Sequence, residues 1–323
     1  MLNSTTASAP GKLMLFGEHS VVHGHPCIVT AVNQRLSVSV EKNGENLFSL
    51  HAPDLQLHAY SKTIKDLGNK PPKQVRFVET LYKSFLEKYP QKETIHVTTK
   101  SDFSSKFGFG SSSAVTVAFA KALTQFYEMN LTNQELFDLC YAAVIKVQGV
   151  GSGFDLAAAI WGGTLYYVSP AKVVKPLNID YLPIVVGYTG IKADTPTLIR
   201  MVANLKVHKR NNVDGIFDQI TGMVEQACGL IENNLWPELG ELMTENQKLL
   251  RKLQVSTVEL EKLISAALGG GAYGAKLSGA GGGDCMITLI SDANKKTVVE
   301  NINSAGGKVL PVELNAQGVR IEP

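Results

Sequence analysis

Three short segments rich in glycine and serine, far apart along the chain, most constrain what this sequence can fold into. They are residues 9–12 with residues 17–19 close behind, residues 106–114, and residues 278–284. Glycine loses more conformational freedom on folding than any other residue, so it is favoured where a tight turn or a close backbone approach requires it. Each segment therefore predicts either a turn or a stretch of backbone that contacts a ligand.

The second segment is the most specific of the three. Gly108 and Gly110 would let backbone N–H groups approach a ligand without obstruction by a Cβ atom, and the apolar pattern of residues 114–126 predicts a helix directly afterwards. The N-terminal end of a helix attracts phosphate. Ser111 and Ser112 could add hydroxyl ligands to a magnesium ion carried by that phosphate. The alternative is a glycine turn capped by serines.

Two common nucleotide motifs do not fit the sequence. A Walker A motif needs Ser or Thr after its Gly-Lys pair, and Leu13 and Val309 stand at those positions. A Rossmann fingerprint would need glycine at Ser113 and should follow the first strand of the chain. The third segment, residues 278–283, is either a turn at a strand edge or a backbone cradle for a second face of the phosphate.

The candidate catalytic residue is a carboxylate in apolar surroundings. Asp155 follows another glycine-bearing stretch, residues 149–153, and precedes the apolar residues 156–161. A buried acid is costly unless it is paired. Lys12, placed after a Pro-Gly pair at the first strand, is the predicted partner. The alternative role for Asp155 is a helix N-cap.

The length and the net charge of the chain limit the classes of protein to which it can belong. A chain of 323 residues predicts about two domains, and 31 basic against 29 acidic residues leave a net charge of +2, which argues against a nucleic-acid or membrane surface. The sequence has no uninterrupted apolar window of membrane-spanning length and no secretion signal at its start. We therefore expect a cytoplasmic protein with reduced thiols. Neither a disulfide framework nor a metal site is predicted from the cysteines and the clustered histidines, which are Cys27, Cys140, Cys228, Cys285, His19, His23 and His25.

The pattern of apolar residues and turn signals predicts alternating strands and helices. Predicted strands cover residues 13–16, 27–32, 36–40, 47–50, 94–98, 162–168, 184–188 and 285–290, and a helix and a strand close the chain. Helical spacing covers residues 75–85, 114–126 and 134–147, and three more helical patterns lie between 195 and 268. Capping boxes are predicted at Thr132 with Glu135 and at Ser256 with Glu259. A proline-bearing stretch, residues 169–183, predicts a passage between two domains.

Taken in order, the three segments resemble the motifs of the GHMP kinases, the superfamily of galactokinase, homoserine kinase, mevalonate kinase and phosphomevalonate kinase. The resemblance spans nearly the whole chain. It implies an α+β fold of two domains, residues 1–175 and 176–323. The N-terminal domain would be like ribosomal protein S5 domain 2, and the C-terminal domain ferredoxin-like. ATP with Mg²⁺ and a small-molecule acceptor would meet in the cleft between them.

The resemblance also implies roles for individual residues. Asp155 and Lys12 would be catalytic: Asp155 would accept or orient the proton of the acceptor hydroxyl, and Lys12 would keep Asp155 ionised. Ser112 would hold the metal ion. The nucleotide would contact Lys106, Gly108, Gly110, Ser111, Ser112, Ser113, Gly281 and Gly282. The acceptor would contact Glu18, His19, Thr195, Gly279 and Ala280.

Two acceptors compete within this superfamily. Residues 9–12 and 17–24 look most like mevalonate kinases, whereas residues 106–112, 148–155 and 283–285 are similar to phosphomevalonate kinases. Mevalonate kinases carry a magnesium-binding Glu eleven residues before the catalytic Asp, and Val144 stands there in this chain, which leaves Ser112 and waters to hold the ion. A nucleotide-binding regulator without turnover is the alternative from another class. The resemblance leaves a homodimer open, and it implies neither a nucleic-acid nor a membrane partner.

Overall fold

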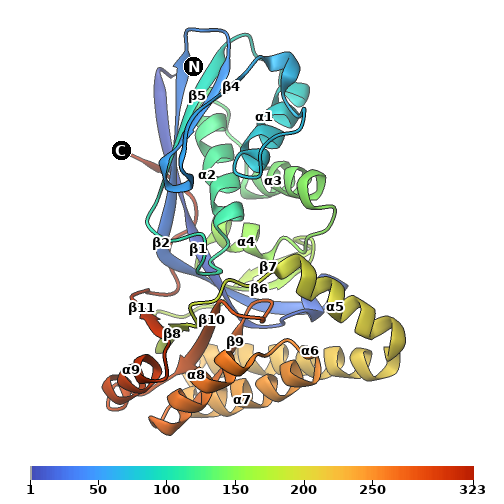
Figure 1. Ribbon diagram of the computed structural model, residues 1–323, viewed down its shortest axis with the longest axis vertical. Helices are drawn as coiled ribbons and strands as arrows, with labels where there is room; N and C mark the ends of the chain where they lie inside the picture. Colours follow the sequence, from blue (N-terminus) through green and yellow to red (C-terminus); the bar gives the residue numbers. More distant parts are fainter. Residues whose placement is uncertain (1) are drawn as a thin grey trace.

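The computed structural model describes residues 2–323, which form two β-sheets with helices on one side of each (Figure 1). The α+β fold of two domains is confirmed. The first part of the chain contains β1 (Ser4–Phe16), β2 (Pro26–Asn43), β3 (Phe48–Ala52), β4 (Leu57–Lys62), α1 (Arg76–Lys88), β5 (Thr94–Ser101), α2 (Ser111–Phe126), α3 (Asn133–Gln148), α4 (Phe154–Trp161), β6 (Thr164–Val168) and β7 (Val173–Pro176).

The long strand β2 organises the first sheet. It pairs antiparallel with β1 along most of its length, with β5 through its C-terminal half and with β6 through its N-terminal end. The two strands predicted at 27–32 and 36–40 are therefore one. The prediction of a loop at residues 9–12 is wrong, because they belong to β1. A register shift between Pro10 and Gly11 marks a bulge there, which accommodates a proline that cannot donate to the ladder.

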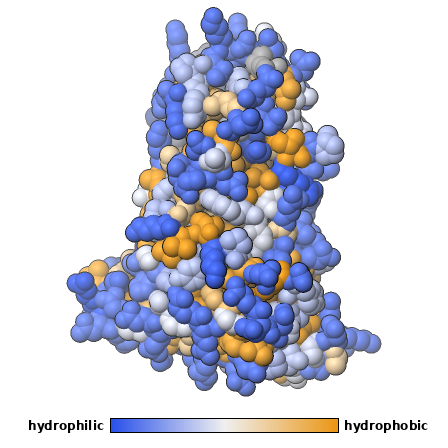
Figure 2. All heavy atoms as spheres, turned by 180° about the vertical axis from the view of Figure 1, so that it is seen from behind, coloured by the Kyte–Doolittle hydropathy of each residue, from blue (hydrophilic) through white to orange (hydrophobic). Residues whose placement is uncertain are grey.

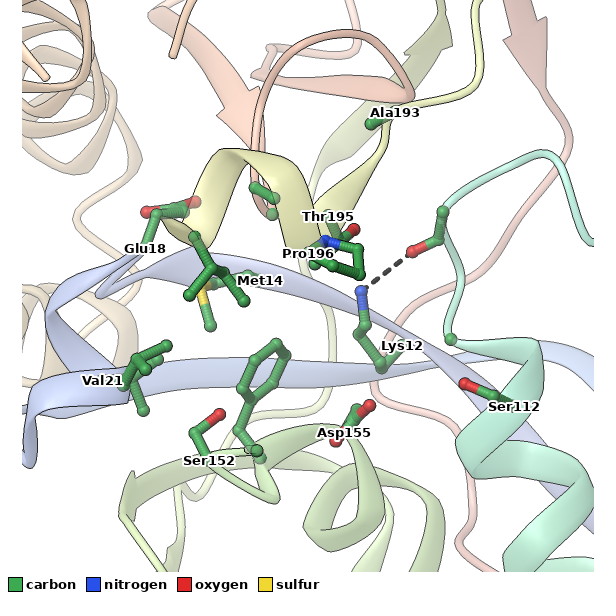
Figure 3. Close-up of a pocket in the computed structure, with 18 of the residues that line it drawn as sticks. Lys12, Met14, Glu18, Val21, Ser112, Ser152, Asp155, Ala193, Thr195 and Pro196 are labelled. Atoms are coloured by element: carbon green, nitrogen blue, oxygen red, sulfur yellow. Dashed lines mark hydrogen bonds between the residues drawn. The ribbon is translucent and has the colours of Figure 1, made fainter. Parts of the chain in front are cut away.

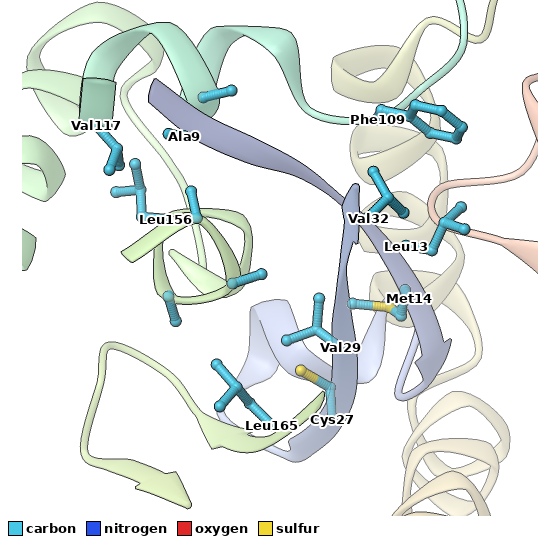
Figure 4. Close-up of a cluster of buried hydrophobic side chains, with 14 of the residues drawn as sticks. Ala9, Leu13, Met14, Cys27, Val29, Val32, Phe109, Val117, Leu156 and Leu165 are labelled. Carbon is cyan, nitrogen blue, oxygen red and sulfur yellow. The ribbon is translucent and has the colours of Figure 1, made fainter. Parts of the chain in front are cut away.

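Helices α1 to α4 cover one face of this sheet, with α2 against β1 and β2 (Figure 1). The core between them is built from alternate strand residues and the apolar faces of α2 and α4 (Figure 4). The predicted capping box is confirmed: Thr132 accepts from the Glu135 N–H, and the Glu135 carboxylate accepts from the Thr132 N–H. Local sequence signals therefore position the helices that border the site.

The second sheet has the strand order β11-β8-β10-β9, all antiparallel. With its helices it follows the ferredoxin-like order, in which the first and third strands are central. Its elements are β8 (Ile184–Tyr188), α5 (Thr195–His208), α6 (Arg210–Glu232), α7 (Trp236–Lys252), α8 (Val258–Gly269), β9 (Gly274–Ser278), β10 (Cys285–Leu289), α9 (Lys295–Ser304) and β11 (Lys308–Leu310).

Two sequence predictions in this half are wrong. Four helices, not three, lie between Thr195 and Gly269, because the break between α5 and α6 is the single residue Lys209 and carries no glycine or proline signal. The N-cap of α8 is Thr257, whose hydroxyl accepts from the Leu260 N–H. The Ser256 hydroxyl instead donates to Glu261, so the predicted cap lies one residue too early.

The chain returns to the first sheet at its end. Strand β12 (Arg320–Glu322) pairs antiparallel with β1, and the Arg35 guanidinium donates to the carbonyls of Gln317 and Gly318 on the way. This return was not predicted, and it means that the second domain is inserted between strands of the first. The division at residue 175 stays a prediction, with β7 ending at Pro176 in the first sheet.

Polar and charged residues cover most of the face opposite to that of Figure 1, and apolar residues gather in small patches, one of them at the waist between the domains (Figure 2). Within residues 2–323, no helix combines the length and the apolar character needed to cross a membrane.

Candidate active site

A cavity of about 450 Å³ lies between the two domains and draws its walls from both. Figure 3 shows its layout: Glu18 and Val21 lie at one end, Ser112 at the other, and Lys12 and Asp155 between them. Of the predicted site residues, the cavity is lined by Lys12, Glu18, His19, Gly108, Gly110, Ser111, Ser112, Asp155, Thr195, Gly279 and Ala280. Segments far apart in sequence therefore do converge on one site.

The Ser112 end of the cavity is built from the start of α2. The helix begins at Ser111, three residues earlier than predicted, and its first intrahelical bonds run from the N–H groups of Ser113 and Ala114 to the Gly110 carbonyl. The N–H groups of Ser111 and Ser112 are thus among those without an intrahelical acceptor. Together with the helix dipole they favour an anion such as phosphate at this end.

Glycine is required at position 110 by the backbone conformation and by the side chains packed around it. Its φ is 75°, in the left-handed region that favours glycine. A Cβ atom at this position would lie 3.2 Å from Lys12 Cε and 3.8 Å from Asp155 Cβ. The glycine turn at residues 108–110 is therefore packed against both Lys12 and Asp155.

Asp155 lies in the first turn of α4, and Gly153 is the N-cap, so the alternative role of Asp155 as an N-cap is excluded. Its Oδ2 accepts a hydrogen bond of 2.5 Å from Ser113 Oγ, and its Oδ1 accepts from the Leu156 N–H at 3.1 Å. These two donors fix the direction of the carboxylate at the start of α4.

Lys12 and Asp155 line the same cavity without a direct ion pair, and Asp155 is the carboxylate whose charge acts most strongly on the Lys12 ammonium, so their predicted partnership stays a prediction. Lys12 Nζ donates to the Gly108 carbonyl at 2.8 Å (dashed line in Figure 3), and within residues 2–323 it has no carboxylate within 4.0 Å. The Gly108 carbonyl lies closer because the glycine turn at residues 108–110 crosses β1, where the Lys12 N–H donates to the Phe109 carbonyl at 2.9 Å. Burial lowers the pKa of Lys12, and the negative charges of Asp155 and Asp284 oppose that shift.

The predicted acceptor residues also line the cavity, with Glu18 at the end opposite to Ser112 and Thr195 near Lys12 (Figure 3). His19 Nε2 lies 3.0 Å from the Ala280 carbonyl oxygen, which can only accept, so this nitrogen carries the proton. Burial lowers the pKa of His19, which favours the neutral ring at pH 7. Thr195 begins α5, followed by Pro196 at a position that suits the first turn of a helix.

Four predicted nucleotide contacts do not line the cavity among the described residues. Lys106 is exposed on the loop before Gly108. Ser113 is buried and donates to Asp155. A Cβ atom at Gly281 would meet the Val255 carbonyl and one at Gly282 would meet the Leu198 side chain, and neither glycine lines the cavity. Contact of these four residues with nucleotide stays a prediction, and their positions outside the cavity wall do not favour it.

Sequence reasoning missed several residues of the cavity wall. Asp284 is half-buried with φ of 53°, and its Oδ1 accepts from the Ala193 N–H at 2.9 Å. Burial raises its pKa. The sequence did carry a signal for this residue, because Asp284 directly follows a run of glycines. Lys192 and Arg200, both exposed, add positive charge to the wall contributed by the second domain, with no motif to reveal them.

The other two histidines of the cluster, His23 and His25, have structural partners. His25 Nδ1 lies 2.8 Å from Thr221 Oγ1, and the His23 ring stacks on Phe217 at 5.0 Å. Within residues 2–323 no group of three or more His, Cys, Asp or Glu side chains could hold a metal ion by itself.

Comparisons with known proteins agree with this architecture. The family model for the GHMP kinases N terminal domain matches residues 76–163, and the model for GHMP kinases C terminal matches residues 228–308. The chain is 35% identical to the mevalonate kinase of Pyrococcus horikoshii, with 100% of this chain and 99% of that protein covered. It is 34% identical to the mevalonate kinase of Thermococcus gammatolerans, with 98% of each covered.

A solved structure gives the same result for the fold. The mevalonate kinase of Methanococcus jannaschii superposes with a TM-score of 0.82 at 25% identity, covering 97% of this chain and 98% of that one. The chain therefore belongs to the GHMP kinase family and shares its whole length with mevalonate kinases of that family.

Proposed function

We propose that this protein is an ATP-dependent kinase that transfers the γ-phosphoryl group to a hydroxyl of mevalonate. The observation that carries the proposal is the placement of Lys12 and Asp155 between a helix N-terminus suited to phosphate and the end of the same cavity that is lined by Glu18 and Val21. The relatives that align over the whole chain are mevalonate kinases, and this similarity indicates mevalonate as the acceptor.

The residues at the Ser112 end suit a nucleotide phosphate with Mg²⁺. Hydroxyl groups of Ser111 and Ser112 lie beside free helix N–H groups, and the carboxylates of Asp155 and Asp284 line the same cavity. Magnesium prefers oxygen ligands and retains several waters. Ser112 would hold the ion together with the phosphates, since Val144 offers no ligand. The nucleotide supplies the phosphoryl group and the ion neutralises its charge.

Asp155 orients the acceptor hydroxyl and receives its proton as the acceptor oxygen bonds to the γ-phosphorus, while the bond from that phosphorus to the bridging oxygen breaks and ADP leaves with the electron pair. The direction of the Asp155 carboxylate is fixed by Ser113 and the Leu156 N–H. Lys12 lies against the same turn and offsets the negative charge that gathers around the transferred group. Transfer of a phosphoryl group needs positioning and charge neutralisation more than strong base catalysis. We therefore assign Asp155 to orienting the acceptor hydroxyl and Lys12 to neutralising the charge on the transferred group.

Phosphomevalonate is the second candidate acceptor. The exposed cations Lys192 and Arg200 line the cavity wall and would suit the additional phosphate of that substrate. Mevalonate is favoured because the full-length relatives are mevalonate kinases. We also assign the protein to the cytoplasm, in keeping with its four unpaired cysteines.

The test is coupled release of ADP with mevalonate and, separately, with 5-phosphomevalonate. We expect kcat/KM to be higher for mevalonate, and Asp155→Asn to reduce kcat by on the order of 10²–10⁴ while nucleotide still binds. A higher kcat/KM for phosphomevalonate would reverse the order of the two acceptors. Nucleotide binding without turnover of either alcohol would identify a regulator instead of an enzyme.

A further inference from the structure

Lys12 lies in the cavity as a cation without an ion pair. Its Nζ donates to the Gly108 carbonyl at 2.8 Å, and among the described residues it has no carboxylate within 4.0 Å. Burial lowers the pKa of Lys12, so its charged form depends on the contacts around it. An ammonium group has three N–H donors, and one bond to a neutral carbonyl balances only part of its charge. A second contact is therefore needed to hold the cation in place.

The ring of Phe154 supplies this second contact. Lys12 Nζ lies 5.6 Å from the centre of the ring, and both side chains line the cavity. The face of an aromatic ring is its negative part, and it attracts an ammonium group that lies within about 6 Å of the ring centre. The attraction is stronger where water is excluded. The ring can therefore stabilise the ammonium group without neutralising its charge.

Other lysines also lie over aromatic rings, but their surroundings differ from those of Lys12. Three of them pair with a carboxylate as well, namely Lys62 with Glu79, Lys206 with Asp214 and Lys276 with Glu18. Lys88 and Lys308 are exposed, so water solvates their ammonium groups. Within residues 2–323, Lys12 differs from both groups, since it is only partly exposed and has a ring but no ion pair.

The position of the ring is fixed by the start of α4. Phe154 and Asp155 are the first two residues of that helix, after Gly153. A Cβ atom at Gly153 would lie 2.8 Å from Phe137 Cζ and 2.9 Å from the Tyr167 hydroxyl oxygen, so the chain is packed tightly where α4 begins. One helix start therefore carries both the carboxylate that orients the acceptor and the ring that contacts the ammonium group.

We propose that Phe154 is a positioning residue for Lys12: its ring holds the ammonium group as a free cation beside the transferred phosphoryl group, out of a direct ion pair with Asp155. This inference rests on the proposed function. Phosphoryl transfer needs a cation near the transferred group and a carboxylate near the acceptor hydroxyl. A direct ion pair would make each group neutralise the other. A ring attracts the cation and takes no proton from it, so Lys12 keeps its charge for the transfer.

The first test replaces Phe154 by phenylalanine that carries one, two or three fluorine atoms on its ring. Fluorine withdraws electrons from the face of the ring and changes its size little, so the series weakens the attraction to a cation and preserves the packing. We expect kcat to fall stepwise, to about 2- to 30-fold below the parent, with the KM for ATP and for mevalonate within about threefold. Equal kcat values along the series would overturn the inference.

The second test detects the contact itself, without turnover. In protein with carbon-13 at lysine Cε, the NMR signal of Lys12 is identified by its loss in Lys12→Arg. A ring face shifts the protons of this group upfield, so Phe154→Leu should move their resonance downfield, and Phe154→Tyr should keep it near that of the parent. Phe77→Leu is the matched control, because Phe77 is also partly buried but lies outside the cavity wall. An unchanged resonance in Phe154→Leu would overturn the inference, and the fluorine series decides if that variant does not fold.

Failure of the proposed function gives a different result. In that case the parent protein releases no ADP with mevalonate, while the resonance of Lys12 still reports its contact with the ring. If the parent turns over mevalonate and the fluorinated proteins keep its kcat, only the inference about Phe154 fails.

Discussion

Ser113 Oγ donates a hydrogen bond of 2.5 Å to Asp155 Oδ2, and this bond joins the first turn of α2 to the first turn of α4. The helix whose start is suited to phosphate therefore also fixes the direction of the carboxylate. A displacement of the start of α2 would therefore also displace the Asp155 carboxylate, because the buried Ser113 hydroxyl has little freedom to move.

Ser113→Ala should lower kcat about 3- to 30-fold. The carboxylate loses a hydrogen bond to a charged group, worth about 1.5–3 kcal/mol, only part of which is lost in the transition state. Steady-state kinetics with saturating ATP and mevalonate measure the change. Ser104→Ala, an exposed serine before the same turn, is the control and should behave as the parent. A parent-like kcat for Ser113→Ala would mean that Asp155 is oriented by other groups.

Gly110→Ala should reduce both stability and turnover, and Gly149→Ala is its matched control. Both glycines have φ of 75°, so both alanines cost on the order of 1–2 kcal/mol in backbone strain. A Cβ atom at Gly149 meets nothing within 4 Å, whereas one at Gly110 approaches Lys12 and Asp155. Thermal unfolding should give similar losses for the two variants, but only Gly110→Ala should lose kcat, by tenfold or more. Equal kcat values would contradict the packing argument.

Ser112→Ala should raise the concentration of Mg²⁺ needed for half-maximal turnover. The Ser112 hydroxyl is the oxygen ligand that we assign to the ion, and Val144 cannot replace it. A magnesium titration at fixed ATP measures the effect, with Ser111→Ala as the neighbouring control, for which we expect a smaller change. The same titration curve for Ser112→Ala and the parent would place the ion on other oxygens.

Lys106→Met should leave the KM for mevalonate within about twofold, whereas Lys192→Met should raise it about 3- to 10-fold. Lys106 is exposed outside the cavity, and Lys192 lines the wall where an anionic acceptor enters. An exposed charge contact is worth little, and salt screens it. The difference between the two variants should therefore shrink at high ionic strength. A larger effect from Lys106→Met would show that its loop folds over the acceptor.

Features coded by neighbouring residues could be predicted from the sequence. The glycine and serine residues before α2, the capping box at Thr132 and the place of Asp155 after a glycine turn all depend on short-range hydrogen bonds and backbone preferences. Their patterns follow from the chemistry of a few adjacent residues. The resemblance to a kinase family then supplied the fold and the type of reaction.

Features set by long-range packing could not be predicted. The hydrogen bond from Lys12 Nζ to the Gly108 carbonyl depends on where the glycine turn at residues 108–110 crosses β1. The Glu18–Lys276 pair joins residues 258 positions apart, and nothing near either residue indicates the other. The single-residue break at Lys209 has no turn signature, so two helices were read as one pattern.

The return of the chain through β12 has a consequence for folding on the ribosome. β12 pairs with β1, the strand that carries Lys12, and it follows the whole second domain in the sequence. The edge of the first sheet therefore stays open until the second domain has been synthesised, and an open strand edge is prone to pair with other chains. β12 closes that edge late in synthesis, after most of the residues that line the cavity have left the ribosome.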